Sequence, residues 1–319
     1  MPRRDCSPPE LLPTSRSRSG GLTDARPYAA VVAATSTFEW VVLTMGDRPS
    51  ELERAVRSLV ARDGVEVLVV ANGAPAEALP ELPNVRSIIL ADNVGIPAGR
   101  HAGMEATQSA IVGFLDDDAT IEGDLSLVMH AFEENSDLGA VSLRIVDEDD
   151  TTNPRHVPRV GGVDPGVGGS VANFLGGACA IRREAYDDVG GYFVDLFYGH
   201  EEIELSWRLA DAGWQVNYLT DVVVRHPRTD ISRHEHGWRL TGRNRVWIAR
   251  RTLPWPVAAV HVAVWLMLGL VRAPRSCRRA YLAGWWSGWT TTWPSGVRRR
   301  PIRWSTVWRL TRLGRPPIV

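Results

Sequence analysis

The feature that most constrains the fold of this chain is a regular alternation of apolar runs and amphipathic segments in its first half. The apolar runs are short and rich in β-branched residues, which is typical of buried strands. Four runs are expected to form strands: FEWVVLTM (38–45), VEVLVVAN (65–72), VRSIIL (85–90) and AIVGFLD (110–116). Two segments are expected to form helices: PSELERAVRSLVA (49–61), which has a proline at its start, and PAGRHAGMEATQ (97–108). This alternation predicts an α/β fold with a mainly parallel sheet flanked by helices.

Beyond residue 135 the pattern becomes less regular. The segment from about 147 to 172 is polar and rich in glycine, and we expect an irregular hairpin or a mobile loop there. NFLGGACAIRREAY (173–186) predicts a strand followed by a short helix, and GHEEIELSWRLADAG (199–213) predicts a helix that ends at its last glycine. The runs WQVNYL and DVVVRH are expected to close the body as strands.

Charge is distributed unevenly along the chain. Up to Pro227 there are 18 Arg and 35 acidic residues, whereas from Arg228 onward there are 18 Arg, two acidic residues and ten of the 13 Trp. We therefore expect three parts: a disordered leader (1–36), a catalytic body (37–227) and a helical basic tail (228–319). The leader has no apolar core typical of a signal peptide, and three widely spaced cysteines fit a reducing compartment, so a cytoplasmic location is expected.

Three consecutive carboxylates, Asp116, Asp117 and Asp118, end the fourth predicted strand. In one interpretation Asp118 caps the following helix or turn and the other two are solvated. In the other, a divalent cation offsets their repulsion, and oxygen ligands suit Mg²⁺ or Mn²⁺. Ligands of such sheets bind beyond the carboxyl ends of the strands, where both this triplet and Thr44–Arg48 lie.

Four motifs in order resemble those of the family 2 inverting glycosyltransferases, which have the GT-A fold, a Rossmann-like, mainly parallel sheet flanked by helices. The motifs are NVGIPAGRHAG (93–103), LDDDA, FLGGACAIRRE and GGYFVDLFYGHEEIELSWRLADAGWQV. The resemblance covers residues 41–226 and includes rhamnosyl- and galactofuranosyl-type transferases of the cell envelope. It implies a nucleotide-sugar donor and a Mg²⁺ or Mn²⁺ cofactor.

The resemblance also implies roles for individual residues. Donor contacts are implied for Thr44, Arg48, Asn72, Asn93, Gly95, Arg100, Asp116 and Asp117. Metal coordination is implied for Asp116, Asp118 and His226, and Gly176 and Gly177 would lie at the acceptor and sugar pocket. Glu202 matches the catalytic base and Glu201 its neighbour.

The chain departs from the family pattern at two places. Where the family commonly has an Asp that reads the nucleotide base, this chain has Ala71, followed by Asn72. Where the family has an acidic residue followed by Asp, this chain has Glu201 and Glu202.

Simple chemistry supports a general base at Glu202, because inversion requires the attacking acceptor hydroxyl to lose its proton. A positioned carboxylate that takes this proton typically raises the reaction rate about 10²–10⁴-fold. An alternative interpretation is that Glu201, Glu202 and Glu204 form a solvated helix face, with Glu204 paired to Arg208. The alternative for His226 is a partly buried structural histidine.

The tail combines arginine, tryptophan and one long apolar run. HGWRLTGRNRVWIARR is typical of an interfacial helix. VAAVHVAVWLMLGLV (257–271) would span about 22 Å as a helix, short of a bilayer core of about 30 Å, so we expect a re-entrant or buried helix. Clustered Trp and Arg favour an anionic membrane surface. Two alternatives to membrane association remain. One is nucleic-acid binding, which is less favoured and is not expected. The other is that the tail forms a subdomain packed on the body or a homo-oligomer interface.

The sequence therefore predicts a metal-dependent inverting glycosyltransferase, peripherally associated with the inner face of the cell membrane. Its acceptor is expected to be a lipid-linked or cell-envelope glycan. The alternatives are a nucleotidyltransferase of similar fold and a non-catalytic membrane scaffold with a degenerate transferase body.

Overall fold

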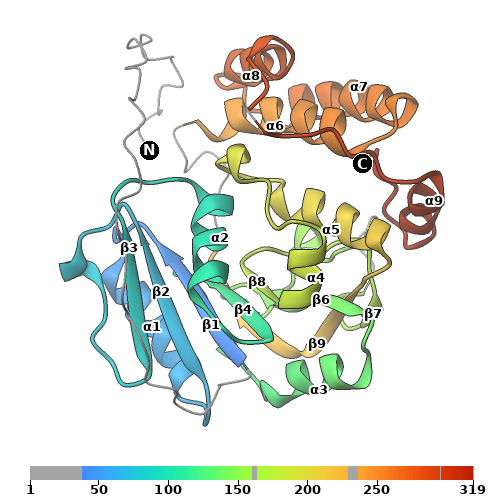
Figure 1. Cartoon of the computed structure of the whole chain (residues 1–319). Helices are drawn as coiled ribbons and strands as arrows, with labels where there is room; N and C mark the ends of the chain where they lie inside the picture. The colour runs from blue at the N-terminus through green and yellow to red at the C-terminus, as the bar shows by residue number, and fades with distance from the viewer. Residues whose placement is uncertain (1–37, 160–163, 229–235, 295, 319) are drawn as a thin grey trace.

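The computed structural model describes residues 38–159, 164–228, 236–294 and 296–318. The predicted leader lies outside these ranges. The described residues form a mixed, mainly parallel sheet flanked by helices, with a C-terminal helical region packed on one side (Figure 1).

The first half of the sheet follows the alternation in the sequence. Its elements are β1 (Phe38–Thr44), α1 (Pro49–Val60), β2 (Glu66–Asn72), η1 (Ala76–Ala78), β3 (Val85–Leu90), α2 (Ile96–Ala106) and β4 (Ile111–Asp116). The four strands pair in parallel in the order β3-β2-β1-β4. All four predicted strands and both predicted helices are confirmed, because each is specified by local periodicity.

The second half is less regular. Its elements are β5 (Thr120–Glu122), α3 (Ser126–Glu134), β6 (Leu138–Val146), η2 (Pro154–His156), β7 (Gly169–Ser170), β8 (Ala178–Arg182), α4 (Arg183–Asp188), η3 (Val194–Leu196), α5 (Glu201–Ala212) and β9 (Gln215–Arg225). Strand β8 lies between β4 and β6 and is antiparallel to both, whereas β6 and β9 are parallel.

Two predictions for this half need correction. The two closing runs form one strand, β9, and the break between them is a register shift against β6 rather than a turn. The segment expected to be an irregular hairpin or loop contains η2 and β7, and β7 pairs antiparallel with β9. Residues 160–163 of that segment lie outside the described residues.

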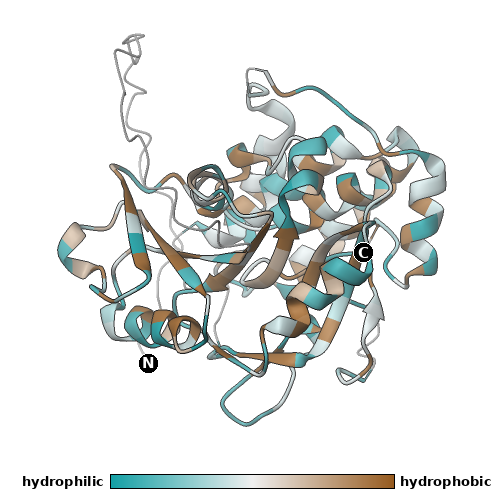
Figure 2. Cartoon of the chain, turned by 60° about the horizontal axis from the view of Figure 1, so that its bottom comes forward, coloured by the Kyte–Doolittle hydropathy of each residue, from teal (hydrophilic) through white to brown (hydrophobic). Residues whose placement is uncertain are grey.

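Helices cover both faces of the sheet. One face buries Trp40 and Val42 of β1 against α1 and α3, and the other buries Val41 against α2, α4 and α5. This alternation along β1 is the period of two expected for a strand buried on both sides. Figure 2 shows the hydrophobic residues concentrated along the central strands.

The described residues of the tail form the helices α6 (Gly237–Thr252), α7 (Trp255–Arg272), α8 (Arg278–Thr290) and α9 (Trp304–Arg312). A third hydrophobic cluster joins Ile203 and Trp207 of α5 to Val246 and Trp247 of α6. The helix expected to be interfacial, α6, therefore packs against the body through Val246 and Trp247, which are both buried.

The longest apolar run forms α7, which begins two residues earlier than the run and has 18 residues. By length and composition alone, α7 is the one helix of the described residues that could cross a membrane, and a third of it is buried.

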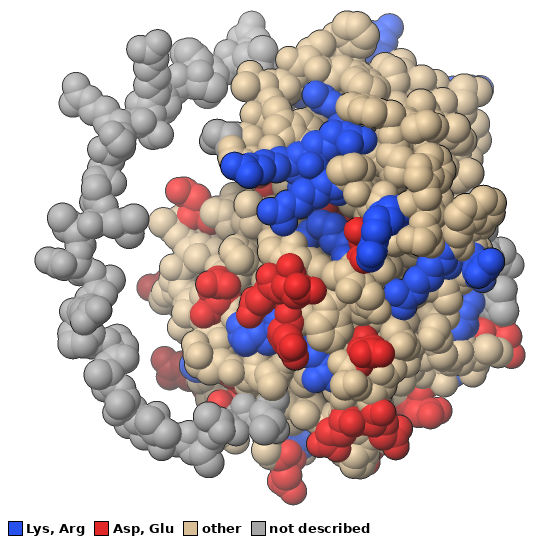
Figure 3. Space-filling view, turned by 45° about the vertical axis from the view of Figure 1, so that its right-hand side comes forward, with Lys and Arg blue, Asp and Glu red and all other residues tan. Residues whose placement is uncertain are grey.

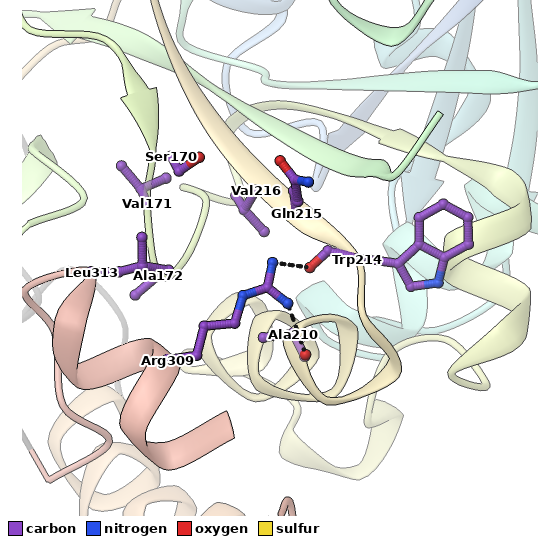
Figure 4. Close-up of a pocket in the computed structure, with 9 residues that line it drawn as sticks. All are labelled: Ser170, Val171, Ala172, Ala210, Trp214, Gln215, Val216, Arg309 and Leu313. Atoms are coloured by element: carbon purple, nitrogen blue, oxygen red, sulfur yellow. Dashed lines mark hydrogen bonds between the residues drawn. The ribbon is translucent and has the colours of Figure 1, made fainter. Parts of the chain in front are cut away.

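Helix α9 is fixed to the body by Arg309. Its guanidinium donates hydrogen bonds to the carbonyl oxygens of Ala210 (3.2 Å) and Trp214 (3.2 Å), beside a small cavity of about 90 Å³ (Figure 4). The tail thus contacts both ends of α5.

Candidate active site

A cavity of about 570 Å³ lies at the carboxyl ends of β1 and β4, where the fold predicts a ligand site. Most of the predicted site residues line it: Thr44, Arg48, Asn72, Asn93, Gly95, Arg100, Asp116, Asp117, Asp118, Gly177, Glu202 and His226. Two predicted residues, Glu201 and Gly176, do not line the cavity and lie behind it, next to Arg100.

The structure brings together the three predicted metal ligands. His226 follows β9, and its Nε2 lies 3.4 Å from Asp116 Oδ2 and 3.3 Å from Asp118 Oδ1. One ligand atom from each of the three residues lies within 4.8 Å of the others. Although burial opposes ionisation, His226 and Arg100 hold the pKa of Asp116 well below its usual range, and the two carboxylates raise the pKa of His226 to about 9. Two carboxylates and one imidazole fit Mn²⁺ or Mg²⁺.

Asp117 has a different environment from its two neighbours. It accepts hydrogen bonds from Thr44 Oγ1 (2.7 Å) and Arg48 Nη2 (2.8 Å), and Arg48 Nη1 also binds Asp118. Burial raises the pKa of Asp117 to about 6, even though Arg48 and Thr44 favour its ionised form. The ends of β1 and β4 are therefore held together by a buried network of hydrogen bonds. The element that follows Asp118 is strand β5 and not a helix, so Asp118 is not a helix cap.

Arg100 connects the aspartates to helix α5. Its guanidinium is buried and donates to Glu201 Oε1 (2.9 Å) and Asp116 Oδ1 (3.0 Å). The two glycines of the predicted sugar pocket make room for this arrangement, because a Cβ at Gly176 would overlap Arg100 and one at Gly177 would overlap Asp116. Both glycines thus permit close packing behind the site.

The three acids of the first turn of α5 have three different environments. Glu202 is half-buried and lines the cavity. Glu201 is 3% exposed, and burial together with the charge of Glu202 raises its pKa to about 8. Glu204 is fully buried and binds Arg208 (2.6 Å), Arg251 and Thr252 (2.8 Å). The predicted Glu204–Arg208 pair is confirmed, but the interpretation of these acids as a solvated helix face is wrong.

Asn72 is used to hold the loop before α2. Its Nδ2 donates to Asn93 Oδ1 (3.0 Å), and its Oδ1 accepts from the backbone amide of Val94 (2.8 Å). Gly95 has a φ of 86° and lies against Phe197, where a Cβ would overlap the Phe197 carbonyl oxygen. The side-chain amide of Asn72, the residue after Ala71, is therefore already engaged in hydrogen bonds inside the protein.

Sequence reasoning missed the loop that precedes α5 and the residue that holds it. Phe197 and His200 have positive φ values of 62° and 75°, which are unfavourable for residues with side chains. Asn244 of α6 is buried, and its Nδ2 donates to the carbonyl oxygens of Leu196 (2.9 Å), Tyr198 (2.7 Å) and Gly199 (3.2 Å). No local pattern could reveal this contact, because Asn244 lies in the tail.

His156 was also missed. It lines the cavity from the segment expected to be a loop, and its ring centroid lies 6.4 Å from that of His226. Burial and the neighbouring Arg155 lower the pKa of His156 to about 4, so this ring is neutral at pH 7.

Comparison with known proteins agrees with this geometry. Residues 40–190 match the family described as glycosyl transferase family 2. The chain is 28% identical over 226 residues to pre-mycofactocin glycosyltransferase from Mycobacterium tuberculosis, covering 66% of this chain and 44% of the relative. It is 26% identical over 163 residues to glucosyl-dolichyl phosphate glucuronosyltransferase from Haloferax volcanii, covering 46% of this chain and 52% of the relative. The chain thus spans about half the length of these curated relatives.

Solved structures show the same fold at low sequence identity. A crystal structure of GalNAc-T7 with UDP, GalNAc and Mn²⁺ has a TM-score of 0.57 at 15% identity, covering 80% of this chain and 56% of that one. The mannosyltransferase PcManGT from Pyrobaculum calidifontis, in complex with GDP-Man and Mn²⁺, has a TM-score of 0.50 at 17% identity, covering 87% of this chain and 72% of that one. The two kinds of comparison agree: residues 40–190 match the sequence model of glycosyl transferase family 2, and the described residues share the GT-A-like fold of these structures.

Proposed function

We propose that this protein is a metal-dependent inverting glycosyltransferase that moves a sugar from a nucleotide-diphosphate donor to a hydroxyl acceptor. The observation that carries the proposal is that one cavity holds both Glu202 and the group Asp116, Asp118 and His226. These are the two parts that such a transfer needs: a site for a charged diphosphate and a base for the acceptor.

The chemistry assigns one task to each part. The acceptor oxygen forms a bond to the anomeric carbon, the bond from that carbon to the diphosphate breaks, and the diphosphate leaves with the electron pair. Glu202 takes the acceptor proton as general base. A Mg²⁺ or Mn²⁺ ion held by Asp116, Asp118 and His226 would supply Lewis-acid stabilisation of the diphosphate.

The position of Glu202 favours this reaction over nucleotidyl transfer. A nucleotidyltransferase also needs a carboxylate-bound metal, but that reaction leaves the half-buried Glu202 carboxylate without a role. A degenerate scaffold is disfavoured because the carboxylates are intact and share one cavity.

Relatives guide the proposed donor and acceptor classes. One structural relative was solved with GDP-Man and Mn²⁺, and a curated relative is named for a glucosyl-dolichyl phosphate substrate. We propose a lipid-linked or cell-envelope glycan as acceptor, and we include rhamnosyl and galactofuranosyl donors among the candidates because of the motif resemblance.

We also propose that the protein associates peripherally with the inner, anionic face of the cell membrane. Large hydrophobic side chains are exposed on α7, α8 and α9: Trp255, Val260, Met267, Val271, Leu282, Trp286, Trp289, Trp304 and Trp308. On the face that Figure 3 shows, most arginines lie in the upper part, which carries these helices, and most acidic residues lie in the lower part. Exposed tryptophan with arginine is the combination that favours anionic lipid interfaces.

The test of the catalytic proposal is a binding screen of UDP-, GDP- and dTDP-sugars with Mn²⁺, with Mg²⁺ and with EDTA. We expect one nucleotide class to bind in the presence of metal. EDTA or Asp118→Ala is expected to weaken this binding at least about tenfold, because the donor diphosphate loses the metal ion that offsets its charge. Calorimetry measures the affinity. If no nucleotide sugar binds under any metal condition, the proposal fails.

A further inference from the structure

The cavity has a second wall, which is built by the C-terminal helices. The residues that form it are Trp238, Thr241 and Arg245 of α6, Trp265, Gly269 and Arg272 of α7, Tyr281 of α8, and Arg315 after α9. Three of these eight are arginines, whereas the aspartates lie on the wall made by the sheet. The cavity therefore extends from the sheet edge to a cationic region next to Glu202.

Arg245 is the most constrained of the three arginines. It is 4% exposed, and its guanidinium carbon lies 3.3 Å from the centroid of the Trp265 ring. Its Nε is buried without a hydrogen-bond partner, and among the described residues no acidic side chain forms an ion pair with it. Burial, with the charge of Arg315, lowers the pKa of Arg245 to about 9, so it remains a cation at pH 7. A buried guanidinium that no carboxylate binds directly favours an anionic ligand beside it.

Arg272 and Arg315 add charge to the same region. Arg272 lies over the Trp265 ring with its guanidinium carbon 5.4 Å from the centroid, and the charge of Arg315 acts on both Arg245 and Glu202. Within the part of the chain that the structure describes, neither forms an ion pair. By contrast, on the opposite wall Arg48 forms ion pairs with three acidic side chains and Arg100 with two.

We propose that Arg245, Arg272 and Arg315 bind a phosphate group of the acceptor and thereby present its hydroxyl to Glu202. This inference rests on the proposed transfer reaction and deepens it. A phosphate suits three cations better than a carboxylate does, because it carries nearly two negative charges and three acceptor oxygens at pH 7. Guanidinium groups bind such oxygens in a bidentate manner.

The position of the arginines assigns the phosphate to the acceptor rather than to the donor. The donor diphosphate belongs at Asp116, Asp118 and His226, on the sheet side of the cavity. Glu202 lies close enough to Arg245 and Arg315 for its charge to act on both. An acceptor held by these arginines therefore lies on the side of the base.

The experiment measures binding of octyl phosphate, 1-octanol and inorganic phosphate to the full chain. Mn²⁺ and a saturating concentration of the nucleoside diphosphate found in the donor screen keep the donor side occupied. We expect octyl phosphate to bind and 1-octanol to bind at least about tenfold more weakly. Octyl phosphate binding more tightly than inorganic phosphate indicates a lipid source, and equal binding of the two indicates a soluble phosphorylated acceptor.

Substitutions identify the residues that bind the phosphate. Arg245→Gln and Arg315→Gln are each expected to weaken octyl phosphate binding at least about tenfold, whereas Arg245→Lys retains part of it. Arg312→Gln is the matched control, because Arg312 is exposed on α9 and does not line the cavity. Thermal melting checks that each variant is folded, and the exposed Arg272→Gln provides the same test if Arg245→Gln does not fold.

Two results would overturn the inference: unchanged octyl phosphate affinity in the folded arginine variants, or competition between octyl phosphate and the nucleoside diphosphate. Failure of the proposed function looks different. Arginine-dependent phosphate binding without any nucleotide binding would reject the transferase and the acceptor role but leave the anion site. Nucleotide binding with no arginine-dependent phosphate binding would reject the anion site alone.

Discussion

Glu202 differs from the other acids of its helical turn in what its side chain can reach. Glu201 is tied to Arg100, and Glu204 is enclosed by Arg208, Arg251 and Thr252. Glu202 alone of the three lines the cavity. At the scale of single residues, one helical turn thus supplies one carboxylate that faces the cavity and two that hold the surrounding structure.

We expect Glu202→Gln to retain metal-dependent donor binding and to lose about 10²–10⁴-fold in transfer rate, because the amide has nearly the same shape but accepts no proton. Calorimetry with the donor and a turnover assay measure the two effects separately. Glu105→Gln is the control, since Glu105 is exposed on α2 and away from the cavity. Wild-type turnover in Glu202→Gln would reject the assignment of this residue as base.

At the scale of elements, α6 acts as a support for the loop that leads into α5. The loop contains two non-glycine residues with positive φ, Phe197 and His200, and Asn244 binds three of its carbonyl oxygens. Arg243 of the same helix binds the Leu196 carbonyl oxygen as well (2.8 Å). Such strained backbone persists only when surrounding contacts hold it. Asn244 therefore supports the loop that leads to Glu202, although it does not itself line the cavity.

Removal of this support is expected to slow transfer more than it weakens donor binding. Asn244→Ala deletes three hydrogen bonds, and a displacement of about 1 Å at the base can cost about 10²-fold in rate. Asn244→Asp has a similar shape but places acceptor oxygens against three carbonyls, so it is expected to be at least as harmful. The measurement is kcat together with the donor dissociation constant. A normal kcat in a folded Asn244→Asp protein would contradict this role.

At the scale of the whole molecule, an acidic body and a basic tail share one hydrophobic cluster. Ile203 and Trp207 of the body pack with Trp247 and Leu253 of the tail. Termination of the chain near Arg228 would expose this cluster to water, so a truncated body would be destabilised. Membrane association is therefore better tested by substitutions on the surface of the tail.

We expect the double variant Met267→Ser and Trp286→Ser to bind anionic vesicles about tenfold more weakly, because both side chains are more than half exposed and would lose apolar contact with lipid. Vesicle sedimentation measures the partitioning. The control is Ile89→Ser, since Ile89 is similarly exposed but lies on β3 of the body. Unchanged sedimentation of the double variant would refute the membrane surface, and a change in oligomeric state instead would favour the oligomer interface.

The sequence by itself determined the parts of the fold that depend on local patterns. The parallel direction of the first four strands follows from the alternation of strands and helices, and each element is set by a period among residues close in the chain. The aspartate triplet and Glu201–Glu202 could be selected because their motifs are contiguous.

The tertiary structure decided which of these residues share a cavity and what surrounds them. The antiparallel insertion of β8, the burial of α6 and the contact between Asn244 and the loop before α5 all join residues far apart in sequence. The role proposed for Arg245, Arg272 and Arg315 also depends on folding: in the sequence they are ordinary members of a basic tail, whereas the fold places them in the same cavity as Glu202. Burial and counter-ions depend on long-range packing, which no local pattern encodes.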